Sequence, residues 1–166
     1  MSTNNDMFGI VSRPQHSVWV HTGSGRGSSY VTCRRFTVVQ EILGDAIEYK
    51  EDAAKGSEFW IKKSGLYFVE YRDSYSGGNT SFGITRNCYP ELNGNETSTT
   101  ITGFSSVNGV FKVIAFVQAS TSATTATCST LINLKQGDVL RAQDNTSNDG
   151  ANIYTSHFKI TYIDQF

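Results

Sequence analysis

The sequence has little proline and no long hydrophobic run. Only 2 of its 166 residues are proline, whereas 15 are glycine. No stretch approaches the ~18 consecutive apolar residues that suggest a membrane-spanning helix, so we expect no membrane insertion. The N-terminal stretch also lacks a charged segment that leads into an apolar one, so we expect no secretory signal.

An excess of charge of one sign is absent too. The chain has 14 Lys and Arg against 15 Asp and Glu, for a net charge of −1 at pH 7. Proteins that bind nucleic acids neutralise phosphates with clustered basic residues. No run of like charge occurs in this sequence, so we expect no nucleic-acid partner.

Cysteine is scarce and has no C-x-x-C spacing. Cys33, Cys88 and Cys128 are the three cysteines. An odd number at wide spacing argues against a disulfide framework, and without a His cluster or an H-E-x-x-H motif it also argues against zinc. We expect three small, half-buried strand residues and no metal or other cofactor.

The chain does contain many short segments rich in β-branched and aromatic residues, separated by polar turns. Their spacing of about ten residues predicts an all-β sandwich, barrel or jelly roll in a single domain over residues 17–166. QEILGDA (40–46) could form one helical turn closed by Gly44. The expected strands are SVWVH (17–21), VTCRRFTVV (31–39), AIEYK (46–50), EFWIKK (58–63), LYFVEYRD (66–73), SFGITRNCY (81–89), NGVFKVIAFVQ (108–118), TATCSTLINL (125–134), DVLRAQ (138–143) and SHFKITYI (156–163).

The strand over residues 66–73 has the clearest pattern. Side chains alternate between the two faces of a strand, so Leu66, Phe68, Glu70 and Arg72 share one face. The other face carries Tyr67, Val69, Tyr71 and Asp73. Both faces begin with apolar residues, so we expect one to cover the core and the other to be covered by a partner.

Residues 1–16 lack periodicity and are expected to form a short extended arm. Polar residues and Pro14 surround a small apolar island, which we expect to dock on this domain or on a neighbouring protein. The candidate docking residues are Met7, Phe8, Ile10 and Val11.

The stretch HTGSGRGSSY (21–30) has three glycines in alternation and at first resembles a phosphate-binding loop. A P-loop requires G-x-x-x-x-G-K-[ST], and a dinucleotide site requires G-x-G-x-x-G at the start of a helix. This stretch has no such lysine and leads into a strand, so no helix N-terminus is there to bind phosphate. We expect a connection between strands, or a loop that contacts a partner through Arg26.

Catalytic arrangements are weak in this sequence. Cys88 or Cys128 could pair with His21 or His157, but no cysteine-protease or nucleophile-elbow motif links them. We expect no enzymatic activity. The carboxylates considered for a glycoside hydrolase pair are Glu48, Glu51, Asp52, Glu58, Glu70 and Asp73.

Among these carboxylates, Glu70 has the most unusual position, because its strand face otherwise carries Leu66 and Phe68. A strand-end ion pair or a contact between subunits would explain it. The oxygen-rich loop at residues 144–149 could hold calcium but lacks EF-hand spacing. Its candidate ligands are Asp144, Asn145, Asn148 and Asp149, and glycosylation sequons at Asn79, Asn95 and Asn145 mark polar loops.

Several motifs resemble those of known families. IKKSGLYFVEYRDSY (61–75), LINLKQGDVLRAQ (131–143) and SHFKITYI (156–163) resemble strands of tumour-necrosis-factor-like and complement globular-head domains. WVHTGSGRGSSYVTCRRFTVV (19–39) is similar to small proteins of tailed bacteriophages. The resemblance implies a jelly-roll β-sandwich that assembles as a homotrimer and has a place on a phage particle. Arg26, Glu70, Tyr71 and Arg72 are then candidate trimer-contact or loop residues.

Two functions fit these expectations. The first is a structural virion protein made in the bacterial cytoplasm, a trimeric decoration or cement protein that binds the major capsid protein or another virion protein. The second is the receptor- or glycan-binding head of a tail fibre or spike, with a host-surface glycan as its partner. A glycan-active enzyme is the third class considered, and the missing acid pair argues against it.

Overall fold

The computed structural model describes residues 15–21, 25–28, 33–74, 81–88, 106–107, 110–111, 113–118, 125–144 and 156–163, and every regular element within them is a β-strand. The strands are β1 (Ser17–His21), β2 (Val38–Leu43), β3 (Ile47–Asp52), β4 (Gly56–Ile61), β5 (Gly65–Ser74), β6 (Ser81–Arg86), β7 (Ser106–Val107), β8 (Val110–Phe111), β9 (Val113–Gln118), β10 (Thr125–Leu134), β11 (Val139–Asp144) and β12 (His157–Ile163).

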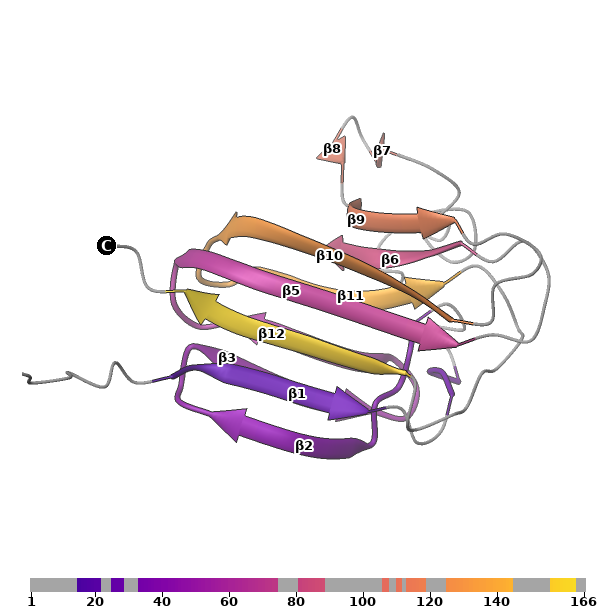
Figure 1. Ribbon diagram of the computed structural model, residues 1–166, viewed down its shortest axis with the longest axis horizontal. Helices are drawn as coiled ribbons and strands as arrows, with labels where there is room; N and C mark the ends of the chain where they lie inside the picture. The colour runs from indigo at the N-terminus through magenta and orange to yellow at the C-terminus, as the bar shows by residue number, and fades with distance from the viewer. Residues whose placement is uncertain are drawn as a thin grey trace, which may run out of the picture.

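Ten of these strands form two five-stranded antiparallel sheets that pack face to face (Figure 1). The front sheet has the order β10-β5-β12-β1-β2, and the back sheet has the order β3-β4-β11-β6-β9. β7 and β8 form a separate two-stranded ribbon. The first and last long strands, β1 and β12, lie side by side in the front sheet. Crossovers of this kind define a jelly roll, as the sequence predicted.

Aromatic side chains from both sheets fill the core. Phe59 of the back sheet stacks on Phe158 of the front sheet, with ring centroids 4.1 Å apart. Tyr71 packs edge-on against Phe82 at 5.0 Å. Rings in these arrangements contribute packing energy beyond the area they bury. The predicted alternation along residues 66–73 is confirmed, because Tyr67, Val69, Tyr71 and Asp73 are buried in the sandwich.

The expectation of a helical turn over residues 40–46 was wrong. Gln40 to Leu43 belong to β2, which pairs with β1. Gly44, with φ of +68°, then ends the strand. Pairing with β1 satisfies the backbone groups on one side of this edge strand, and a single helical turn cannot compete with that.

The fold includes the last residue of the arm predicted over residues 1–16. His16 is buried, and its backbone oxygen accepts a hydrogen bond from the Tyr162 backbone N–H at 2.9 Å. The arm candidates Met7, Phe8, Ile10 and Val11 lie outside the described residues, as do residues 145–149 of the calcium loop and all three sequons.

Candidate functional site

The outer face of the front sheet is the side of that sheet that points away from the core. It forms because residues of each strand alternate between core and outside, and the cross-strand registers bring the outward residues into rows. Among the residues of the outer face are Trp19 and His21 of β1, Leu66, Phe68, Glu70 and Arg72 of β5, Leu131 and Asn133 of β10, and His157, Lys159 and Thr161 of β12.

One part of the outer face is apolar and open to solvent. Phe68 and Leu131 lie directly opposite each other on β5 and β10. Phe68 is 36% exposed and Leu131 is 58% exposed. Large apolar side chains that adjoin on a sheet surface are typical of a face that another protein covers.

The adjoining part of the outer face is a cluster of rings and charges. Nε2 of His157 lies 2.8 Å from Oε1 of Glu70 and donates a hydrogen bond to it. The His157 ring is also 6.0 Å from the ring of His21 and 6.4 Å from that of Trp19. Nζ of Lys159 lies 5.3 Å from the Trp19 ring centroid, in range of a cation–π interaction. These contacts hold the charged groups in fixed positions on the sheet.

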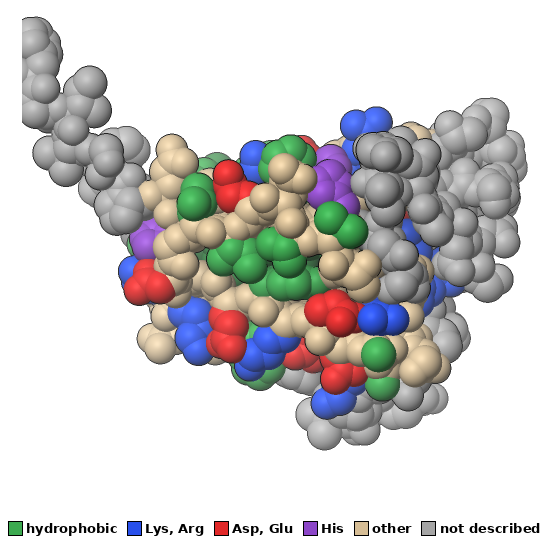
Figure 2. Space-filling model, turned by 90° about the horizontal axis from the view of Figure 1, so that it is seen from below, with side chains coloured by type: hydrophobic (Ala, Val, Ile, Leu, Met, Phe, Trp, Pro, Cys, Tyr) green, Lys and Arg blue, Asp and Glu red, His purple; other side chains and the backbone are tan. Residues whose placement is uncertain are grey.

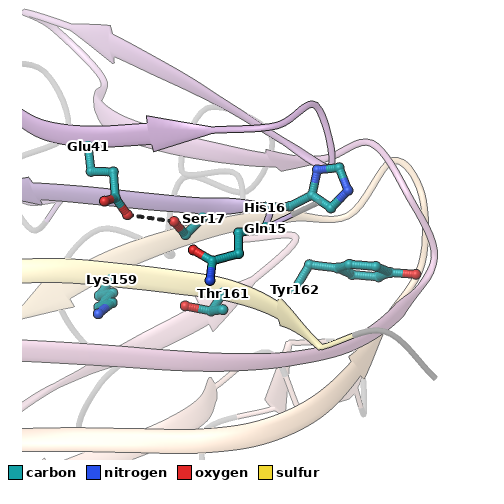
Figure 3. Close-up of a pocket in the computed structure, with 7 residues that line it drawn as sticks. All are labelled: Gln15, His16, Ser17, Glu41, Lys159, Thr161 and Tyr162. Atoms are coloured by element: carbon teal, nitrogen blue, oxygen red, sulfur yellow. Dashed lines mark hydrogen bonds between the residues drawn. The ribbon is translucent and has the colours of Figure 1, made fainter. Parts of the chain in front are cut away.

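A polar cavity of about 230 Å³ lies near the start of β1 (Figure 3). Gln15, Ser17 and Thr161 line the middle of the cavity, between Glu41 and Lys159 on one side and His16 and Tyr162 on the other. Ser17 Oγ donates a hydrogen bond to Glu41 Oε1 at 2.7 Å. A mixture of hydroxyl, amide, carboxylate and ammonium groups around one small cavity suits a polyhydroxylated ligand.

The four residues predicted to contact a neighbouring subunit, Arg26, Glu70, Tyr71 and Arg72, do not share one surface. Glu70 and Arg72 lie on the outer face, and Glu70 accepts a hydrogen bond from His157 within the chain. Tyr71 lies on the opposite face of β5 and is fully buried. The side chain of Tyr71 therefore packs in the core and is not presented to a neighbouring subunit. Arg26 is half-buried and its backbone pairs with that of Arg34.

The glycine-rich connection packs backbone against backbone. Gly27 N–H donates to the Cys33 oxygen at 3.0 Å, and Ser28 N–H donates to the Ala53 oxygen at 2.9 Å. A Cβ on Gly27 would stand 2.5 Å from the Ala54 oxygen. Only glycine allows this approach, so the described part of the stretch has a packing role in an inter-strand connection.

Every carboxylate considered for catalysis has a partner of another kind. Asp73 pairs with Arg34 at 2.9 Å, and Glu58 pairs with Arg141. Asp52 accepts two backbone hydrogen bonds in the turn between β3 and β4. The remaining pairs are Glu48 with Lys50 and Lys62, Glu51 with Arg35, and Glu70 with His157.

The thiols are equally unsuited to nucleophilic chemistry. All three cysteines are buried thiols. Burial raises the pKa of the Cys128 thiol to about 12, so this group is protonated at neutral pH. The part of the chain that the structure describes also contains no group of three or more His, Cys, Asp or Glu side chains placed to hold a metal ion.

Sequence reasoning did not find Trp19, His157 and Lys159 as members of the site. Trp19 and Lys159 lie opposite each other across β1 and β12 although 140 positions apart in sequence. No local pattern could show this contact. The alternation of SVWVH and SHFKITYI placed these residues on one strand face, but only the strand order brings the two faces together.

No helix within the described residues is long and apolar enough to span a membrane. No protein-family model matches the sequence, and neither does any curated protein. Among solved structures, murine APRIL is similar with a TM-score of 0.60 and 10% identity, over 90% of this chain and 99% of that chain.

The structure of GITRL from pika is also similar, with a TM-score of 0.54 and 10% identity. The match covers 92% of this chain and 98% of that chain. Both are ligands of the tumour necrosis factor family. At this identity they show the fold alone, and the chain has the tumour-necrosis-factor-like jelly roll that the sequence motifs predicted.

Proposed function

We propose that this protein is a non-enzymatic structural protein that assembles as a homotrimer through the outer face of its front sheet and decorates the head of a tailed bacteriophage. The outer face is the observation that carries the proposal. Phe68 and Leu131 adjoin there and stay accessible to water in the single chain. Burial of apolar area of this kind drives most protein association.

The composition of the outer face supports a subunit interface. The exposed apolar pair lies beside rings and charges that are already paired within the chain, such as Glu70 with His157. Charges that already have partners cost less to desolvate than unpaired ones. Interfaces commonly combine an apolar centre with polar groups of this kind around it.

The chemistry of the chain supports a non-enzymatic role. The carboxylates considered for catalysis are bound by cations or by backbone N–H groups, and the thiols are buried. General acid–base catalysis needs a group that can reach substrate and exchange a proton. The buried pair of Asp73 and Arg34 instead has a structural role in the sandwich.

The phage part of the proposal rests on sequence. Residues 19–39 are similar to small proteins of tailed phages, and the arm offers Met7, Phe8, Ile10 and Val11 to the major capsid protein or another virion protein. Cysteines in the thiol form suit assembly in the reducing bacterial cytoplasm. The expected location is the surface of the particle.

Immunogold labelling of purified particles tests this location. Label spread over the heads is the expected result, and label confined to tail tips would contradict the decoration role. A chain that lacks residues 1–14 tests the arm, because it leaves the described fold intact. We expect it to form trimers but to lose binding to heads, and normal coating would show that the arm is not the anchor.

The polar cavity supports a second function, a receptor- or glycan-binding head of a fibre or spike. Glu41 and Lys159 on one side of the cavity could bind the hydroxyls of a sugar. Calorimetric titration with host-surface glycan fragments tests this function. Binding that is lost in both Glu41→Ala and Lys159→Ala would favour it over decoration, and no binding by the wild-type chain would remove it.

A further inference from the structure

Strand β2 is an open edge of the front sheet and carries apolar side chains on both faces. Within the described residues its one neighbouring strand is β1. Four of its six residues are aliphatic and well exposed: Val38 at 42%, Val39 at 49%, Ile42 at 50% and Leu43 at 37%. An edge strand of this composition is a template for pairing with another strand.

The neighbouring edge of the back sheet is built differently. β3 lies on the same side of the sandwich as β2 and carries Glu48, Lys50, Glu51 and Asp52 (Figure 1). Charged residues on an edge strand prevent pairing with other chains, and β2 lacks both lysine and proline. Figure 2 shows this side of the molecule, with hydrophobic side chains at its centre and charged side chains around them. The arrangement is that of an apolar contact with a polar rim.

A bulge in β2 determines which residues share a face. Glu41 lies opposite Trp19 and Val39 lies opposite Val20, so Gln40 is the extra residue. Val38 and Leu43 therefore both point to the outer face, although an odd number of positions separates them. Val39 and Ile42 both point to the core side.

We propose that β2 pairs with β2 of a second copy of this chain, antiparallel and about a two-fold axis, to join two front sheets into one. The bulge makes this register self-complementary. Val38 then lies opposite Leu43 of the second copy, and Val39 lies opposite Ile42. In each pair both residues are aliphatic and point to the same face, as antiparallel pairing requires.

The centre of this register is also complementary. Gln40 lies opposite Glu41 of the second copy, so an amide can donate to a carboxylate at each of two equivalent places. In each chain Glu41 already accepts a hydrogen bond from the hydroxyl of Ser17, and a carboxylate can accept further hydrogen bonds. In this register no charged residue of one copy lies directly opposite a residue of the same charge in the other copy.

Contact through one six-residue strand is smaller than the interface of a stable dimer, which buries about 800 Å² per partner. We therefore expect weak pairing between single chains and stronger association when several β2 edges act together. In a trimer that uses the outer face, three such edges would link one trimer to another.

A pair of cysteine variants tests the register. Residues 39 and 42 of two copies lie opposite each other, about 5 Å apart at Cβ, close to what a disulfide needs. Residue 39 of one copy lies about 10 Å from residue 39 of the other along the strand. We expect a mixture of V39C and I42C chains to form a disulfide-linked dimer under mild oxidation, while each variant alone does not. Equal cross-linking by V39C alone, or none in the mixture, overturns the proposal.

Charge variants provide a second test that does not depend on oxidation. V39E places a carboxylate opposite Ile42 in both halves of the contact, so we expect sedimentation velocity to show loss of all association through this edge. A mixture of V39E and I42K chains restores one favourable pair and should regain association. Failure of the mixture to regain it, in chains with wild-type circular dichroism, contradicts the register.

These experiments separate this contact from the trimer. L131E alters the outer face and leaves β2 unchanged, so it should abolish the trimer and preserve cross-linking between V39C and I42C. If the wild-type chain never forms trimers but the mixture cross-links, the outer-face assembly is wrong and the β2 contact stands. If trimers form but the mixture does not cross-link, the β2 contact is wrong and the outer-face assembly stands. Q136E, in the exposed turn after β10, is a neutral control for added charge.

Discussion

The imidazole of His16 occupies the space beside Gly44 where any other residue would carry its Cβ. A Cβ built on Gly44 would stand 2.0 Å from Nδ1 of His16. That nitrogen accepts a hydrogen bond from the backbone N–H of Asp45 at 3.0 Å, and the His16 ring packs edge-on against Tyr162. This contact fixes the start of β1 against the turn between β2 and β3, next to the polar cavity.

Substitution of Gly44 by alanine should therefore be costly. Gly44 has φ of +68°, and its added Cβ would displace His16. We expect G44A to lower the free energy of unfolding by about 2–4 kcal/mol in urea titrations. G137A is the matched control, because Gly137 also has positive φ but no atom within 4 Å of a new Cβ. It should lose only about 1 kcal/mol, and equal losses in both variants would show that the His16 contact contributes nothing.

The buried pair of Arg34 and Asp73 should contribute strongly to stability. Arg34 Nε lies 2.9 Å from Asp73 Oδ2, and the two side chains are 1% and 6% exposed. Ser156 Oγ donates to the same carboxylate at 2.6 Å. D73N leaves a buried guanidinium without its counter-charge, at a cost of about 3–5 kcal/mol.

D45N is the control for that variant, because Asp45 pairs with Lys63 but is 76% exposed. We expect thermal unfolding of D45N to differ little from wild type, since solvent screens an exposed ion pair and leaves it little net contribution to stability. A D73N chain as stable as D45N would contradict the assignment of Arg34 and Asp73 as a structural pair.

Acid should lower the stability of the protein in part by protonating Asp52, in the turn after β3. Backbone N–H groups of Lys55 and Ala54 donate to Asp52 and hold its pKa below the ordinary value of 3.8. A carboxyl with a lowered folded-state pKa stabilises the protein above its unfolded-state pKa, and this contribution is lost as pH falls through the folded-state pKa. The difference in urea midpoint between wild type and D52N should therefore shrink as pH falls below about 4. A difference that is constant with pH would contradict this role of Asp52.

The three thiols should not react with disulfide reagents in the folded protein. All three cysteines are buried, and burial raises the pKa of Cys128 to about 12. The thiolate reacts with disulfide reagents and the thiol does not, so at pH 8 we expect no fast reaction in the native state. All three should react after denaturation, and the absorbance of the released reagent counts them. One fast-reacting thiol in the native protein would reopen the question of nucleophilic chemistry.

The strand pattern could be predicted where one face of a strand packs in the core and the other face points to solvent. Along β5 the alternation correctly assigned Tyr67, Val69 and Tyr71 to one face and Phe68 to the other, because a period of two follows from strand geometry alone. The same reasoning failed at residues 40–46. The bulge at Gln40 interrupts the alternation of β2, and the pairing with β1 that stabilises it has no local signature.

The candidate site was only partly predictable for a similar reason. Glu70 stood out as a charge on an otherwise apolar strand face, but its partner His157 lies 87 positions away. The buried partner of Asp73 is Arg34, 39 positions away. Such contacts follow from strand order, which sequence periodicity does not encode. The role of Gly27 in a close backbone contact with Ala54 also depends on a pairing that only the fold creates.

Sedimentation equilibrium of the wild-type chain beside F68E and L131E tests whether the protein assembles as a trimer through the outer face. We expect the wild-type chain to be a trimer at micromolar concentration. Each variant places a carboxylate on the apolar part of the outer face and should dissociate to smaller species while its circular dichroism stays unchanged. A wild-type chain that remains a monomer, or variants that remain trimers, would contradict assembly through the outer face.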